Sequence, residues 1–188
     1  MSLNNDFDVG PLTWVKGEID TALNSARDRL AEVQADPAQR EPLRFAQSHV
    51  HQASGALSIV GLDGVSQFAE AIDKLISALA SNEVVTTPEV LAVALRSVGM
   101  LGNYINEISA GAPHQPLRLF PAYQELVAAR GGEAPQPSEL FFPDLSVRPQ
   151  LASNAAIDPI FGRRTVTIMG DGGFWHNGLT SGDQKSVV

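Results

Sequence analysis

Four amphipathic segments, separated by helix-breaking residues, constrain the fold of this chain more than any other feature of its sequence. In each segment apolar residues recur at steps of three and four, the spacing of one face of an α-helix. Proline or glycine stands near the ends of these segments, where it stops a helix or fits only its first turn. The segments span residues 12–33, 43–60, 65–79 and 91–108. The pattern predicts four helices with one buried face each.

A shorter apolar pattern before Gly131 and Gly132 predicts a fifth helix, with Leu119, Tyr123, Leu126 and Val127 on its buried side. Each apolar face is too narrow to be buried except against the others, and the connections are short. We therefore expect an all-α fold, an antiparallel four-helix bundle plus a fifth helix, over residues 1–132. A linker over 133–160 and an irregular, disordered tail over 161–188 are expected to follow.

Composition excludes several classes of function. The net charge is −8 and none of the 13 basic residues form a run, so we expect no nucleic-acid partner. The chain has no cysteine, which rules out disulfides, zinc–thiolate sites and cysteine nucleophiles and suits a reducing cytoplasm. It shows neither a signal peptide nor the roughly 20 consecutive apolar residues of a membrane span. We expect a cytoplasmic protein with no membrane contact.

His51 is the candidate functional residue of the second segment. A helix turns by about 100° per residue, which places His51 roughly 130° from the centre of the apolar face and predicts that it is exposed. Arg44, Ser48, Gly55 and Ser58 share this outward side, and together with Ser54 they form the candidate docking face. The side chains here are mostly small or polar, which leaves room for a visiting protein surface.

An exposed imidazole is able to carry a phosphoryl group, because one ring nitrogen is a free nucleophile and the product can pass its phosphate to a carboxylate. Mg²⁺ and charge stabilisation would come from the partner's active site, so we expect no cofactor here. The segments also lack the carboxylate pairs and histidine spacings of a metal site. Position alone favours the simpler interpretation, because a lone exposed histidine on a helix is usually just a solvated surface residue.

The other histidines are weaker candidates. His49 lies about 200° from His51 around the helix, at the edge of the apolar face, so we expect it to serve packing. His114 stands in a proline-bounded loop, and we assign it no function from the sequence. His51 is therefore preferred.

Residues 51–56, His-Gln-Ala-Ser-Gly-Ala, followed by Gly61, resemble the signature of histidine-phosphotransfer (Hpt) domains. That signature commonly has a basic residue just before its first glycine, where this chain has Ser54. Segments 12–16, 119–121 and 139–145 extend the resemblance to the N-terminal modules of CheA-like hybrid histidine kinases of type IV pilus (twitching motility) systems, over residues 1 to about 150. The glycine-rich ATP-binding boxes of their kinase core do not occur in this sequence.

The resemblance implies a phosphocarrier that is not a catalyst on its own. His51 would take phosphate from a histidine kinase catalytic domain and pass it to the aspartate of a response-regulator receiver domain. Some modules of such kinases have lost the phosphoacceptor and serve in docking. A phosphotransfer-inactive docking or scaffold module is therefore the alternative, and Ser54 favours it.

Residues 163–182 resemble a different family, because their Gly-Asp-Gly at 170–172 is similar to the thiamine-diphosphate motif of indolepyruvate ferredoxin oxidoreductases. There Asp171 would hold the Mg²⁺ that bridges the cofactor's diphosphate. That motif needs a large α/β domain and a further asparagine beyond the end of this chain. We therefore expect no bound cofactor and no oxidoreductase, and interpret the tail as a chimeric fusion or assembly artefact joined between Gln150 and Arg163.

Overall fold

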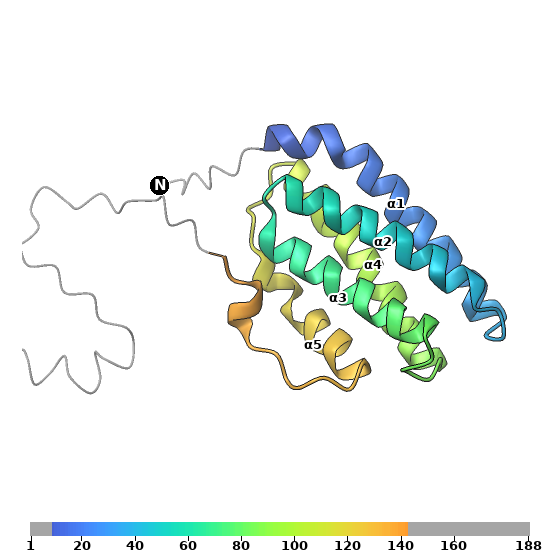
Figure 1. The fold of residues 1–188 in the computed structure, drawn as a ribbon. Coiled ribbons are helices and arrows are strands. Elements are labelled where there is room, and N and C mark those ends of the chain that lie inside the picture. The colour runs from blue at the N-terminus through green and yellow to red at the C-terminus, as the bar shows by residue number, and fades with distance from the viewer. Residues whose placement is uncertain (1–8, 143–188) are drawn as a thin grey trace, which may run out of the picture. The chain divides into compact units, whose positions relative to one another are not determined.

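The computed structural model of this chain describes residues 9–142, which form helices joined by turns and short irregular segments (Figure 1). Its helices are α1 (Val9–Ala35), α2 (Glu41–Ile59), α3 (Asp63–Ala80), α4 (Pro88–Ser109) and α5 (Phe120–Ala129), with the 3₁₀ turns η1 (Pro116–Leu119) and η2 (Pro137–Leu140). No strand occurs among these residues, so the predicted all-α class is confirmed. Residues 143–188, which include most of the expected linker and the whole tail, lie outside the described residues.

The first four helices form a ring in chain order. α1 packs against α2 and α4, while α3 packs against the same two helices from the other side. Short connections at alternating ends make sequential neighbours antiparallel, and α5 lies outside the ring against α3 and α4 (Figure 1). Within the described residues, no helix is long and apolar enough to cross a membrane.

The predicted apolar faces form the core. Almost every residue of the four patterns is buried; Val15, Val60 and Leu95 are the half-buried exceptions. Phe68 is the largest fully buried side chain, and the fifth helix adds Tyr123 and Leu126 to the same cluster. Full burial of one such side chain contributes about 1.5–3 kcal/mol. The packing of the four apolar faces against one another therefore determines which polar residues lie on the surface of the bundle.

Local signals set the helix ends. After α2, Leu62 N–H donates to Leu57 O and Gly61 N–H to Ser58 O, which is a Schellman motif with Gly61 at φ +80°. Thr87 is the N-cap of α4, and its Oγ1 accepts from Val90 N–H at 3.3 Å. Thr86 and Glu89 have the sequence spacing of a capping box, but the N-cap is one residue later.

The segment after α5 differs from the expected linker. Leu140 of η2 is fully buried in the core, and η2 packs against α3. Glu139 fixes the turn, because Oε1 accepts from Gln136 N–H at 2.8 Å and Oε2 accepts from the Tyr123 hydroxyl at 2.9 Å. Residues 137–140 therefore belong to the packed unit, eight residues beyond the boundary expected at Gly132.

Gly64 permits this packing. A Cβ on Gly64 would lie 2.5 Å from Leu140 O and 2.7 Å from Pro116 Cβ, both closer than real Cβ contacts. Gly64 lies in the first turn of α3. Its lack of a side chain is what lets η1 and η2 approach the helix.

We expect Gly64→Ala to lower the free energy of unfolding by about 1–3 kcal/mol, the usual cost of overpacking a tight contact. Urea unfolding followed by circular dichroism measures this change. Gly99→Ala in α4 is the matched control, since a Cβ there meets nothing within 4 Å, and it should be neutral or stabilising by up to about 1 kcal/mol. Equal effects of the two substitutions would contradict the close-approach role of Gly64.

Tyr104 and His114 hold the connection between α4 and η1. The buried Tyr104 hydroxyl accepts from Gln115 N–H at 2.7 Å and lies 3.0 Å from His114 Nδ1, with the two rings in edge contact. Burial raises the pKa of Tyr104 to about 12 and lowers the pKa of His114. A protonated phenol therefore donates to a neutral imidazole.

This pair predicts a pH-dependent stability. Because the folded-state pKa of His114 is below its unfolded value of about 6.5, the unfolded chain binds the proton more readily. The neutral His114 imidazole makes its full contribution to the free energy of unfolding above the unfolded-state pKa of about 6.5. This contribution is lost as the pH falls through the folded-state pKa of His114. Urea unfolding between about pH 5 and 7.5 should show a smaller decline for His114→Gln than for wild type; identical slopes would exclude His114 as the source.

Candidate functional site

His51 stands on the solvent side of α2, as its position off the apolar face predicts. Its side chain is 79% exposed, whereas Val50 and Ala53 on the same helix are buried. His49 is half-buried at the edge of the packed face, in agreement with the expected packing role. The two neighbouring histidines therefore occupy different environments, and His51 is the more accessible of the two.

Asp73 of α3 is the side chain that faces His51. Asp73 Oδ2 lies 3.4 Å from His51 Nδ1, at the long limit of a hydrogen bond. The carboxylate is only 15% exposed, and its other oxygen is buried with no hydrogen-bond partner among the described residues. An Nδ1–H that donates to this carboxylate fixes the tautomer in which Nε2 carries the nucleophilic lone pair.

Most residues of the predicted docking face are exposed on the same helix. Arg44, Ser48, Gly55 and Ser58 are exposed on the same helix as His51, while Ser54 is half-buried. Gly55 follows His51 by one turn, and a Cβ at this position would meet nothing within 4 Å. The space beside the imidazole is therefore open, and Gly55 adds no side chain to it.

The structure adds residues of α1 that the sequence did not suggest. Glu18 Oε2 accepts from Gln52 Nε2 at 3.4 Å, which ties α1 to the position after His51. Trp14 stands one turn before Glu18 and is 88% exposed. α1 thus contributes to the same side of the bundle as the imidazole.

Three large apolar side chains flank this side, and we name Trp14, Phe45 and Ile59 the apolar margin. Phe45, Gln52 and Ile59 recur every seven residues on α2, which places them on one side of that helix. Ile59 is 86% exposed, and Phe45 lies under the Arg29 guanidinium at 5.7 Å from its ring centroid. These exposed side chains offer apolar area that a docking protein could bury.

Some of the surface residues that the sequence analysis did not select could have been found from their helical positions. Trp14 and Ile59 fall off the apolar patterns of their helices, so their exposure could have been predicted. Asp73 also falls off its pattern, but only the packing of α3 against α2 shows that it faces His51.

The described part of the chain contains no candidate metal centre. No group of three or more histidine, aspartate or glutamate side chains there could hold a metal ion. Asp171, the candidate ligand of a thiamine-diphosphate site, lies outside the described residues.

Comparison with known proteins agrees with this geometry. Searches of curated proteins and of solved structures returned no significant match. The family model described as Hpt domain matches residues 17–111, just over half of the chain, from α1 through the end of α4. The matched range includes both His51 and Asp73. Domains of this family transfer phosphate through histidine in phosphorelays, with kinases and response regulators as partners. This chain belongs to the Hpt domain family.

Proposed function

We propose that His51 is the phosphoacceptor of this domain and that a CheA-like kinase of a type IV pilus chemosensory system supplies its phosphate. The observation that carries the proposal is an exposed imidazole whose Nδ1 faces the Asp73 carboxylate. The resemblance of segments 12–16, 119–121 and 139–145 supports the pilus context. Because the kinase consumes ATP, we place the domain in the cytoplasm.

In the first step, His51 Nε2 attacks the γ-phosphorus of ATP bound in the kinase. A P–N bond forms, the P–O bond to ADP breaks, and ADP leaves with that electron pair. Positive charge develops on the imidazole ring, and the Asp73 carboxylate beside Nδ1 stabilises it. Asp73 therefore acts as a positioning residue, because it touches the histidine and not the phosphoryl group.

In the second step, a receiver carboxylate oxygen attacks the phosphorus, and the electron pair of the P–N bond returns to Nε2. The receiver provides the Mg²⁺ for this step, so the Hpt domain needs only to present its histidine. The open space at Gly55 allows close approach, and burial of the apolar margin would contribute to affinity. The receiver and the kinase would use this surface in turn.

A docking module without phosphotransfer is the second candidate, and the charge around His51 favours it. Ser54 replaces the basic residue common before the glycine, and Asp73 is the only charged side chain found in contact with His51 within residues 9–142. A phosphoryl group on His51 would depend on the partner for most of its neutralising charge, because Arg44, the basic residue of the docking face, stands about two turns away on α2.

Replacement of His51 separates the two candidates. The full chain, incubated with a type IV pilus CheA-like kinase core, Mg²⁺ and labelled ATP, should gain label that is acid-labile and alkali-stable. His51→Gln should abolish the label, because no nucleophilic nitrogen remains at that position. His49→Gln is the matched control two residues away, and it should retain most of the label.

Absence of label on the wild-type chain, with a known Hpt domain labelled in parallel, would retire His51 as the phosphoacceptor and support the docking module. Label that persists in His51→Gln but is lost in His49→Gln would move the phosphoacceptor to the half-buried histidine.

We expect Asp73→Asn to slow phosphorylation of His51 by about 10- to 100-fold, the usual effect of removing a partner that orients a functional histidine. Asp73→Glu should recover part of the rate, because it keeps a carboxylate on α3. Asp63→Asn, which changes an exposed acid in the first turn of the same helix, is the matched control. The measurement is the initial rate of label incorporation, with circular dichroism to establish folding. A normal rate in a folded Asp73→Asn protein would remove Asp73 from the mechanism.

A further inference from the structure

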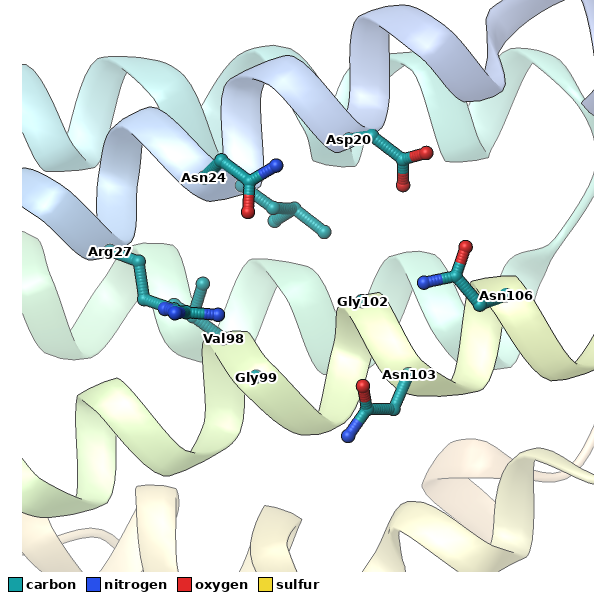
Figure 2. Close-up of a pocket in the computed structure, with 9 residues that line it drawn as sticks. Asp20, Asn24, Arg27, Val98, Gly99, Gly102, Asn103 and Asn106 are labelled. Atoms are coloured by element: carbon teal, nitrogen blue, oxygen red, sulfur yellow. The ribbon is translucent and has the colours of Figure 1, made fainter.

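A groove between α1 and α4 lies away from the phosphotransfer site. It has a volume of about 210 Å³, and its floor includes Gly99 and Gly102 of α4 (Figure 2). Since α1 to α4 form a ring in chain order, the α1–α4 side is opposite the α2–α3 side, where His51 meets Asp73. A ligand in this groove would not compete with a partner over His51.

The glycines on the floor have no packing explanation. Glycine is among the least favourable residues in a helix interior, yet both lie within α4. A Cβ on Gly99 would meet nothing within 4 Å, and a Cβ on Gly102 would make only an ordinary contact of 3.8 Å with Leu23. Alanine would fit at either position and would favour the helix. What glycine does here is leave the floor without side chains.

Polar side chains without intramolecular partners surround this floor. Figure 2 shows Asn24 and Arg27 of α1 and Asn106 of α4 extending toward the space between the two helices. All three residues are exposed, and none of their side chains makes a hydrogen bond or ion pair with another residue of the described part of the chain. Each amide offers both a donor and an acceptor, the same pair that a peptide group presents.

The charges along the groove are uneven. Asp20 lies at one end and Arg27 at the other, seven residues apart on α1 and therefore about 10 Å along its axis. Lys16 pairs with Asp20 and balances its charge, whereas Arg27 has no acidic partner within residues 9–142. The groove thus carries one uncompensated positive charge at the Arg27 end.

We propose that the α1–α4 groove binds an extended peptide segment with an acidic side chain. Three extended residues span about 10 Å, the distance between the two charged ends. The acidic side chain pairs with Arg27, and the amides of Asn24 and Asn106 bond the peptide backbone. An open, polar groove suits a repeating backbone better than a small ligand, which usually needs an enclosed apolar pocket.

The test is a titration of the ¹⁵N-labelled full chain with acetyl-Ala-Asp-Ala-amide, followed by NMR. Saturable shifts are expected at the side-chain amides of Asn24 and Asn106 and at the Gly99 backbone amide, with a Kd of about 1 mM to 10 mM. The neutral acetyl-Ala-Asn-Ala-amide should bind about threefold to tenfold more weakly, because it lacks the charge for Arg27. Arg27→Gln should remove this preference.

Gly99→Leu is a second, steric test, since it fills the groove without a clash at Cβ and should abolish the shifts. Shifts that do not saturate, or saturable shifts unchanged in both Arg27→Gln and Gly99→Leu, would overturn the proposal. Neither variant alters His51 or its neighbours. A loss of peptide binding can therefore be distinguished from a loss of phosphotransfer when both are measured on the same variants.

Discussion

The mutual burial of four apolar helix faces is the constraint on which the rest of this structure depends. One helix cannot bury its apolar face without the other helices, so the four helices close into a ring. The ring fixes the rotation of each helix about its own axis. That rotation turns His51 outward on α2 and turns Asp73 on α3 toward it. The candidate site is thus a consequence of core packing, although neither residue belongs to the core.

The same constraint explains what could be predicted from sequence. Helix positions and the exposure of His51 follow from periodicity within one segment, and both were predicted correctly. The Asp73 contact, the close approach at Gly64 and the burial of Leu140 each join segments distant in the chain. Periodicity carries no information about such pairings, which depend on how one helix is rotated and shifted against another. For this reason the prediction of a linker was wrong at residues 137–140.

The two sides of the bundle differ in how they are built. On the α1–α2 side the apolar margin is exposed beside a histidine, an arrangement suited to a transient protein partner. On the α1–α4 side, glycines and unpaired amides replace the apolar residues. Because the two surfaces lie on different sides of the bundle, the proposed peptide in the groove would leave His51 accessible to a second partner.

If His51 carries phosphate as proposed, the charges around it suit transfer to a partner better than storage of the phosphoryl group. Asp73 is placed to stabilise positive charge on the ring, and no basic side chain in the described residues forms a hydrogen bond with His51. A phosphoryl group held without a local cation is stabilised only while a partner supplies Mg²⁺ or basic side chains. Ser54 would then leave the free phosphorylated domain weakly stabilised, so that the receiver's own charges provide much of the driving force for transfer.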